Sequence, residues 1–444
     1  MTTTTTRIVR RTPLAAYALY ALCALLGAIP AHLAAQTTAP AAVPVTFFGE
    51  IRARSEMDRP GGGLPTDVFT YLRTRIGIRA QPADGVRLLF QLQDSRVYGA
   101  NTAVAAASIF DLHQGYVDFS ATWRDADVTT RVGRQEVALG NERLVGAVNW
   151  SNTGRTFDAA RVLFSPRSAA SGAAEWTATA FVATVDERGR RFGATPAADD
   201  LEPADRALVG AYATRKIDDG TLHATLLFDA GANYRSYSSS NRFTADARYV
   251  SNTAARFGVD IEGAYQAGTQ HYRASGTSTT SSQDVGAWLL AARAGVFPSA
   301  GRRTSAIVGA DILSGDATSV DGRYTAFATL YATNHSKYGL MDLFGDPAGR
   351  TKERGLVDAL GMVSRELNSR TTLQAELHRY NTQAGDTREI GWELDVVAPV
   401  RLSGGASLQF GYGAFRAGPG AAAIGLGAEG SSRHWAFAMV RAAF

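Results

Sequence analysis

Residues 68–96 read VFTYLRTRIGIRAQPADGVRLLFQLQDSR, and this stretch decides the fold. Apolar and polar side chains alternate along its two halves, which a short proline- and glycine-containing break at residues 81–85 separates. One face carries Val68, Thr70, Leu72, Thr74, Ile76, Ile78 and Ala80, followed by Val86, Leu88, Phe90 and Leu92. The other face carries Tyr71, Arg73, Arg75 and Arg79, followed by Arg87, Gln91 and Gln93. Because side chains alternate with a period of two along a strand, the pattern predicts an antiparallel hairpin with one face in lipid and the other in water.

The same alternation recurs in three further segments, residues 116–123, 373–378 and 390–396. Their apolar members are Val117, Phe119 and Ala121, then Leu373, Ala375 and Leu377, and then Ile390, Trp392, Leu394 and Val396. The composition agrees, with 45 glycines, 20 phenylalanines, 16 tyrosines and only 14 prolines. Several soluble β-domains would share these features. A single closed barrel accounts for them better, because closure leaves no open edge and places alternate side chains in lipid and in water.

The length of the chain predicts the size of this barrel. Some 400 residues, at roughly twenty-odd residues per strand and connection, give about sixteen to twenty strands, enough for a channel. Short turns are expected at residues 82–85 and 366–369. Longer polar loops are expected at residues 187–206, 268–283 and 315–323. Short periplasmic turns opposite longer extracellular loops are typical of barrels in bacterial outer membranes.

The N-terminus has the three parts of a secretory signal peptide. Arg7, Arg10 and Arg11 precede an apolar run over residues 14–29, and small residues follow up to Ala35. A spanning helix needs about 20 apolar residues, more than this run provides. We therefore predict a signal peptide over residues 1–35, with Ala41 as an alternative cleavage position, a short leader over 36–45 and one barrel domain over 46–444.

Charge and cysteine content narrow the class further. Only three of the 45 Lys and Arg residues lie in the predicted signal peptide, and the chain has 41 Asp and Glu residues, so the mature protein is nearly neutral. This balance argues against nucleic acid as a partner. The one cysteine, Cys23, lies in the apolar run, so neither a disulfide nor a cysteine metal site is expected in the mature chain.

The C-terminus resembles the last strand of an outer-membrane barrel. Residues 434–444 read HWAFAMVRAAF, in which Val440, Ala442 and Phe444 share one apolar face. Outer-membrane proteins commonly present such a strand to the barrel assembly machinery, which we therefore expect as a partner through the strand that ends at Phe444.

Residues 131–161 read RVGRQEVALGNERLVGAVNWSNTGRTFDAAR and hold five arginines among strand-forming and turn-forming residues. Glycines at positions 133, 140, 146 and 154 divide the segment, which predicts two strands joined by a loop. Arginine suits a wall that must hold carboxylates or phosphates, because its planar guanidinium donates two parallel hydrogen bonds.

This segment resembles the signature block of the alginate export family, which are outer-membrane β-barrels of Gram-negative bacteria. The match comprises GRQ, then G-x-E-R-L-x-G, then W-S-N-T-G-R-x-F-D and a further arginine. Residues 311–316, DILSGD, are similar to the family's D-x-L-S-G-D element, and residues 335–342, HSKYGLMD, to its H-x-x-Y-G-x-M-D loop. The resemblance implies an all-β fold, a single transmembrane antiparallel barrel of about 18 strands.

The resemblance also implies an arginine-rich constriction. It carries this role to the matched residues Arg134, Arg143, Arg155 and Arg161, with Asp158 as the acidic neighbour. Alternation alone adds Arg73 and Arg75 to the predicted pore lining. A second interpretation is that these arginines form structural ion pairs across a wet barrel interior, with Asp118, Glu136, Glu142 and Asp158 as partners. Both interpretations can hold for the same residues.

Nothing in the sequence predicts catalysis. His113, His223, His271, His335, His378 and His434 are scattered without metal-ligand spacing, and no G-x-S-x-G or H-E-x-x-H motif occurs. Ser151 lies in a turn-forming sequence, where structural hydrogen bonding is the simpler role. Neither a catalytic site, nor a metal site, nor a cofactor is expected, and Asp342 and Asp346 do not complete a calcium-loop pattern.

The sequence thus predicts a monomeric outer-membrane channel that passes an anionic solute through an arginine-lined lumen. The family resemblance implies export of an alginate-like polysaccharide, with periplasmic export components as further partners. The alternative is a passive uptake porin for small anions or sugar acids. A barrel enzyme acting on lipid or glycan is a third and less favoured class.

Overall fold

The computed structural model describes residues 43–61, 63–98, 109–167, 175–186, 206–231, 237–251, 257–273, 280–297, 303–316, 322–386 and 388–444. The predicted signal peptide, and the leader up to residue 42, lie outside this part of the chain. So does most of the predicted loop at residues 187–206.

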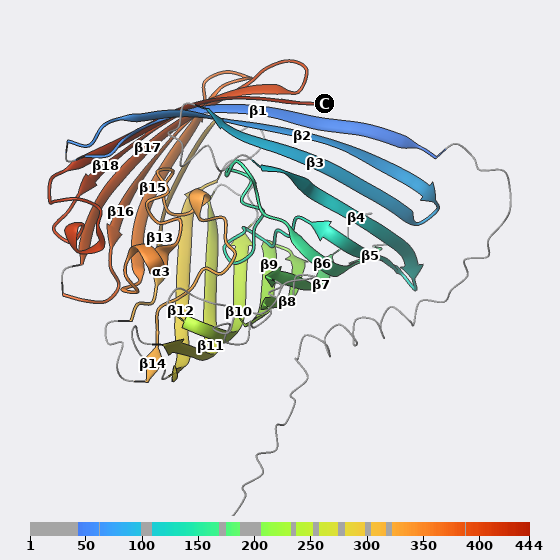
Figure 1. The fold of residues 1–444 in the computed structure, drawn as a ribbon, viewed down its shortest axis with the longest axis horizontal. Coiled ribbons are helices and arrows are strands. Elements are labelled where there is room, and N and C mark those ends of the chain that lie inside the picture. The colour runs from blue at the N-terminus through green and yellow to red at the C-terminus, as the bar shows by residue number, and fades with distance from the viewer. Residues whose placement is uncertain are drawn as a thin grey trace, which may run out of the picture.

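The described residues form a closed ring of eighteen antiparallel strands, seen in Figure 1 as a curved wall around a central space. Each strand pairs with its neighbours in sequence, and β1 also pairs with β19, which closes the ring. The strands are β1 Val45–Arg59, β2 Asp67–Ala83, β3 Val86–Tyr98, β4 Ile109–Trp123, β5 Ala126–Gln135, β6 Phe157–Pro166, β7 Trp176–Asp186, β8 Arg206–Ile217, β9 Gly220–Ala230, β10 Tyr237–Ser251, β11 Gly258–Arg273, β12 Thr280–Val296, β13 Thr304–Leu313, β15 Leu356–Glu366, β16 Thr372–Asn381, β17 Glu389–Arg401, β18 Ala406–Ala417 and β19 Ser432–Ala443. The two-residue strand β14, Arg323–Tyr324, pairs in parallel with β12 and lies outside the ring. The predicted barrel of about 18 strands is confirmed.

The hairpin of β2 and β3 shows how side-chain alternation builds the wall. Ile76 and Phe90 are 57% and 44% exposed on the outer face, whereas Arg73 and Gln93 are each 3% exposed on the inner face. Gly85 closes the turn with a φ of 74°, a conformation that glycine adopts without strain. The alternation read from residues 68–96 is confirmed, with apolar side chains facing lipid and polar ones facing the lumen.

The segment of residues 390–396 departs from simple alternation at one position. Trp392 and Leu394 are exposed outside and Glu393 and Asp395 are buried inside, as expected, but Ile390 is fully buried. The register of β16 and β17 shifts between Tyr380 and Asn381, opposite this point. A β-bulge reverses the facing of the residues beyond it, so the prediction that Ile390 faces outward is wrong.

The two ends of the barrel differ in the length of their connections. One end has tight turns, such as residues 84–85, 124–125 and 218–219, and the other has the longest connections. Residues 268–273 and 280–283, predicted as part of a long loop, extend β11 and β12 instead. Their polar residues continue the inward alternation, since Gln270 and Gln283 are buried. The prediction of a loop over these residues was wrong, because a strand that faces the lumen is as polar as a loop.

Two long connections turn inward and occupy the middle of the barrel. They are residues 136–156, teal in Figure 1, and the described residues 314–316 and 322–355, orange, and we call them the first and second inner loops. The second inner loop contains a short 3-10 turn at Asn334–Ser336 and the one-turn helix α3, Pro347–Arg350; a second 3-10 turn, Ala422–Ile424, lies between β18 and β19. In the part of the chain that the structure describes, every helix is too short or too polar to cross a membrane. The two inner loops share a hydrophobic core with the inner face of the wall, which includes Val137, Leu144, Val145, Phe327, Tyr338, Met341, Phe344, Phe181 and Leu208.

Candidate functional site

A cavity of about 710 Å³ lies inside the barrel against β1, β2 and β19. Its charged lining consists of five arginines and two glutamates, namely Arg52, Arg73, Arg75, Arg79, Arg441, Glu50 and Glu136. Phe48, Ala443 and Phe444 also line it, which places it toward the end of the barrel with the tight turns. A surplus of fixed guanidinium groups in such a space raises the local concentration of anions.

The arginines come together because of strand register. Arg52 on β1 lies directly opposite Arg73 on β2, and Arg75 is the next inward residue on β2. Directly opposed like charges destabilise a strand pair unless other groups compensate them. We call the inner face of β1–β3, with these arginines and Arg54, the basic wall.

The backbone of the first inner loop supplies most of the compensation. Arg52 donates to the carbonyl oxygens of Asn149 and Ser151, at 2.7 and 2.9 Å. Arg73 donates to the same two oxygens, at 3.0 and 3.1 Å. Arg54 donates to the carbonyl of Trp150 at 2.5 Å. Three arginines thus hold three successive carbonyl groups, and we call residues 149–153 the docked turn.

Neighbouring side chains of β3 hold the same turn by neutral hydrogen bonds. Gln93 donates to the carbonyl of Thr153 at 2.8 Å, and Ser95 to the carbonyl of Asn152 at 2.8 Å. The side-chain amide of Asn152 donates in return to the backbone carbonyl of Arg96 at 3.0 Å. The W-S-N-T-G sequence therefore folds as a turn whose backbone fits the basic wall.

Two carboxylates also face this cavity. Glu50 accepts from Arg73 at 2.7 Å and from Arg441 at 2.6 Å, which joins the second strand to the last. Glu136 lies 2.9 Å from His113 and 3.5 Å from Arg75. Burial alone would raise the pKa of Glu136, but the hydrogen bond with His113 and the charge of Arg75 outweigh it and hold the pKa below its ordinary range.

A second part of the lumen wall, separated from β1 by β18 and β19, carries acids instead of arginines. Glu393 on β17 accepts from the backbone N–H of Met341 at 3.0 Å, and Asp395 accepts from that of Leu340 at 2.9 Å. His378 contacts Asp358 at 3.0 Å and Glu376 at 3.4 Å. We call this inner face of β15–β17 the acidic wall. It binds amide groups of the second inner loop, whereas the basic wall binds carbonyl groups of the first.

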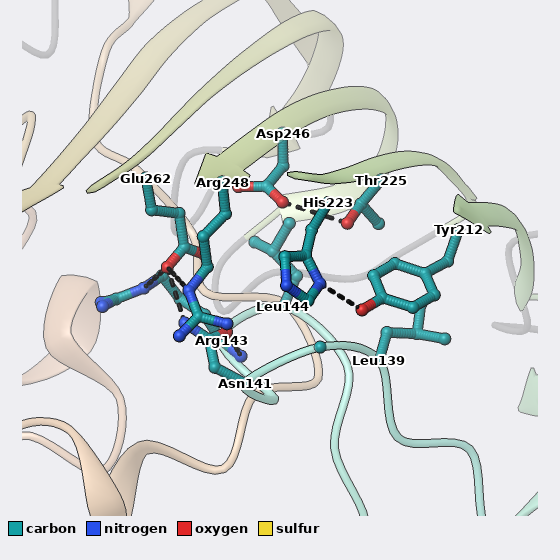
Figure 2. A pocket seen from close by; sticks show the side chains of 11 residues that line it. Leu139, Asn141, Arg143, Leu144, Tyr212, His223, Thr225, Asp246, Arg248 and Glu262 are labelled. Carbon is teal, nitrogen blue, oxygen red and sulfur yellow. Dashed lines mark hydrogen bonds and ion pairs between the residues drawn. The ribbon is translucent and has the colours of Figure 1, made fainter. Parts of the chain in front are cut away.

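Arg143 joins both inner loops to the barrel. Its side chain is 1% exposed and donates to Glu262 of β11 at 2.8 Å, to Asp311 of β13 at 2.5 Å and to the hydroxyl of Tyr338 at 3.1 Å. Burial alone would lower its pKa, but the carboxylates of Asp311 and Glu262 raise it well above the ordinary value. Figure 2 shows this contact, in which Arg143 and Asn141 of the loop meet Glu262 and Arg248 of the wall.

The small space beside this contact, about 10 Å³, is large enough for about one water molecule. Arg143 therefore lies in a buried ion-pair cluster away from the arginine-lined cavity.

Arg155 and Arg161 likewise lie outside the lining of that cavity. Arg155 donates to the backbone carbonyls of Tyr331 and Ala332, which ties the first inner loop to the second. Arg161 donates to the hydroxyl of Thr179 at 2.9 Å, along the inner face of β6 and β7.

Arg134 and Asp158 lie on the outer face of the barrel. Asp158 is exposed, whereas Phe157 and Ala159 on either side of it are buried inside the barrel. Arg134 is its register partner on β5, and the two side chains are 3.3 Å apart. Asp111 contacts Arg134 from the other side at 3.5 Å. This ion-pair cluster lies near the end with the long connections.

Of the predicted pore-lining residues, the structure brings Arg73 and Arg75 into one cavity. Sequence reasoning missed Arg52, Arg441 and Glu50 as members of it, and it assigned Arg79 to the right face without counting it as a site residue. The signal was present in residues 49–57, GEIRARSEM, where Glu50, Arg52, Arg54 and Glu56 occupy alternate positions.

The matched motifs meet at the inner loops. Tyr338 accepts from Arg143 and its carbonyl accepts from Tyr380, while Gly339, at a φ of 83°, leaves no room for a side chain beside Glu393. Asp311 of the D-x-L-S-G-D element pairs with Arg143 and with Arg293 at 3.0 Å. The residues of these motifs thus make the contacts that hold both loops inside the barrel.

Comparison with known proteins shows the family to which the chain belongs. The alginate export family matches residues 43–433. The chain belongs to the alginate export family. No curated protein sequence matches it.

The fold of this family member is similar to porins of known structure. OccK8 (OprE) of Pseudomonas aeruginosa matches with a TM-score of 0.57 at 11% identity, over 90% of this chain and 98% of that one. A BenF-like porin from Pseudomonas fluorescens Pf-5 matches with a TM-score of 0.57 at 8% identity, and OccK2 (OpdF) of P. aeruginosa in complex with glucuronate with 0.55 at 10%, both over 90% of this chain and 98% of theirs. At these identities the likeness shows the fold alone.

Family and fold together identify an outer-membrane channel protein. The family is one of export proteins. Within the described ranges, no cluster of three or more His, Cys, Asp or Glu side chains is arranged to hold a metal ion. Asp346 instead caps α3 by accepting from the N–H of Gly349, and Asp342 contacts His335 at 3.0 Å.

Proposed function

We propose that the barrel passes an anionic solute along the basic wall, and that this solute is an alginate-like polysaccharide on its way out of the cell. The arginine-lined cavity carries the proposal, because five guanidinium groups face two carboxylates within 710 Å³. Planar guanidinium groups on a rigid wall suit carboxylates, which they bind by paired hydrogen bonds.

Uptake of small sugar acids is the second candidate. The match to OccK2 in complex with glucuronate favours it, since a sugar acid is bound in a barrel of the same fold. A monomer, cleaved near Ala35 and assembled through the strand that ends at Phe444, would serve either direction. Export would add periplasmic components as partners.

Ion selectivity tests the channel. In a planar bilayer with a salt gradient, the reversal potential should show a preference for anions. Arg79→Ala should reduce that preference, because Arg79 is exposed in the cavity and stacks only on the ring of Phe48, at 3.7 Å. Arg96→Ala is the matched control: it removes the same charge outside the lumen, where Arg96 pairs with Asp94, and should leave the potential unchanged.

Two further measurements separate the candidates. Block of the chloride current by a polyuronate at low concentration, but not by neutral dextran, would favour the polymer. Glucuronate current without polyuronate block would favour small sugar acids. A preference for cations would contradict the proposal in both forms, and hydrolysis of lipid or glycan would point to the enzyme class.

A further inference from the structure

The docked turn occupies the basic wall in the way that a carboxylate would. Arg52 and Arg73 each donate to the same two oxygens, the carbonyls of Asn149 and Ser151, at 2.7–3.1 Å. A carboxylate likewise has two oxygens, and each can accept hydrogen bonds from two guanidinium groups. The turn lines the same cavity through Asn149 and Trp150.

A real carboxylate would bind these arginines more strongly than the turn does. The carbonyls are neutral acceptors, whereas a carboxylate carries a negative charge that attracts both guanidinium groups and can accept two parallel hydrogen bonds from one of them. Arg52 and Arg73 face each other in register, so a negative charge between them also relieves their repulsion. Unused donors remain as well: within the described residues, Nε of Arg52 and Nη2 of Arg75 are buried without a hydrogen-bond partner.

We propose that the docked turn is a built-in competitor for the anion site. A carboxylate group of the solute displaces the carbonyls of Asn149 and Ser151 from Arg52 and Arg73, and the released turn widens the passage between the cavity and the other end of the barrel. This proposal rests on the proposed function and adds how the solute gains entry.

Release of the turn must also break its other contacts with the wall and with the second inner loop. Arg54 donates to the carbonyl of Trp150 and lies 3.8 Å from its ring, Arg75 donates to the side-chain oxygen of Asn149 at 3.0 Å, and the indole of Trp150 stacks on His335.

On β3 the docked turn is held by three neutral hydrogen bonds, from Gln93, Ser95 and Asn152. The base of the first inner loop is fixed separately by the buried cluster at Arg143 and by the contacts of Arg155. The turn can therefore leave the basic wall while the loop stays anchored.

Thiol labelling tests the release directly. Cys23 is the only cysteine of the chain and lies in the predicted signal peptide, so Thr153→Cys gives a single reporter in the turn. Glucuronate should increase the rate at which a maleimide labels this position several-fold, whereas glucose at the same concentration should not. Asp219→Cys, in the turn between β8 and β9, is the matched control and should label at the same rate in both sugars.

A cross-link tests whether release is needed for transport. The hydroxyl of Ser95 donates to the backbone carbonyl of Asn152, so the two residues are neighbours, and Ser95→Cys with Asn152→Cys should form a disulfide that holds the turn on the wall. The oxidised protein should lose its glucuronate current and keep its chloride current, and reduction should restore the glucuronate current. A second variant, Ser95→Ala with Asn152→Ala, removes two neutral hydrogen bonds and should lower the glucuronate concentration for half-maximal labelling by roughly tenfold.

The outcomes separate this proposal from the one on which it rests. Absence of anion preference in the reversal potential would remove the proposed function itself. Anion preference with glucuronate-independent labelling at position 153, and with equal glucuronate current in oxidised and reduced protein, would overturn the competitor proposal and leave the anion channel standing.

Discussion

The basic wall and the acidic wall hold the two inner loops by opposite chemistry. Arginines of β1 and β2 capture carbonyl oxygens of the docked turn, and Glu393 and Asp395 of β17 capture amide groups of the second inner loop. The acidic residues are closed in by the loop they hold, whereas the arginines keep a cavity beside them. Both walls therefore anchor a loop, but only the basic wall also lines an open cavity.

The largest loss of stability is expected at Arg143, where the two inner loops meet β11 and β13. Arg143→Met would leave Glu262 and Asp311 buried with their main cation removed. Breaking a buried ion pair on one side costs about 3–5 kcal/mol, so unfolding of the barrel in detergent should shift to clearly lower temperature. Arg134→Met is the matched control, because that ion pair lies on the exposed outer face and should change stability by less than about 1 kcal/mol. Equal shifts for both variants would contradict the central role of Arg143.

The hold of the acidic wall on the second inner loop can be weakened by one substitution. Glu393→Ala removes the acceptor for the backbone N–H of Met341 and for the hydroxyl of Tyr380. Leaving a buried donor unsatisfied costs about 1–3 kcal/mol, so limited proteolysis should cut the second inner loop faster. Glu393→Gln keeps an acceptor oxygen and should be cut at nearly the wild-type rate. If both variants are cut alike, the negative charge, and not the hydrogen bond, holds the loop.

A substitution in the basic wall should change stability less, and ion selectivity more, than one in the acidic wall. Arg52→Gln removes two donors to the docked turn but also ends the opposition of Arg52 and Arg73, and these effects partly cancel. We expect a stability change within about 1 kcal/mol together with a reduced preference for anions in the reversal potential. A large loss of stability with unchanged selectivity would mean that the wall is only structural.

The smallest effect concerns Lys337 in the second inner loop. Burial, with the charges of Arg143 and Arg293, lowers its pKa to about 8. The folded protein therefore releases this proton at lower pH than the unfolded chain, so stability should rise as the pH increases from about 8 toward the ordinary lysine pKa of about 10.4. Lys337→Met should remove that rise and stabilise the protein at pH 7 by on the order of 1 kcal/mol. A pH profile of thermal unfolding that is unchanged by the substitution would contradict this assignment.

Much of the barrel could be predicted from side-chain alternation, because a strand between lipid and water has apolar and polar residues at alternate positions of its sequence. The positions of Ile390 and of residues 268–273 and 280–283 were not predicted, for different reasons. A bulge opposite Ile390 is a property of strand pairing, and polar lumen-facing strand has the same composition as loop.

The site was harder to predict than the fold. The arginines of residues 131–161 mark the family, yet Arg143 and Arg155 bind groups more than 100 residues away that no local pattern reveals. The cavity instead depends on β1 and β19, and the roles of Arg52 and Arg441 can be recognised only when the first and last strands are known to be neighbours.

That neighbourhood has a consequence for biogenesis. The seam where the chain closes on itself is joined by Glu50 with Arg441 at 2.6 Å, by Asp58 with Arg433 at 2.5 Å and by Glu56 with the indole N–H of Trp435 at 2.9 Å. The cavity straddles this seam, so its charged lining is complete only after the final strand has paired with the first. Until that pairing forms, the chain lacks the Glu50–Arg441 ion pair and the side of the cavity that β19 provides, although the other four arginines of the lining lie on β1 and β2.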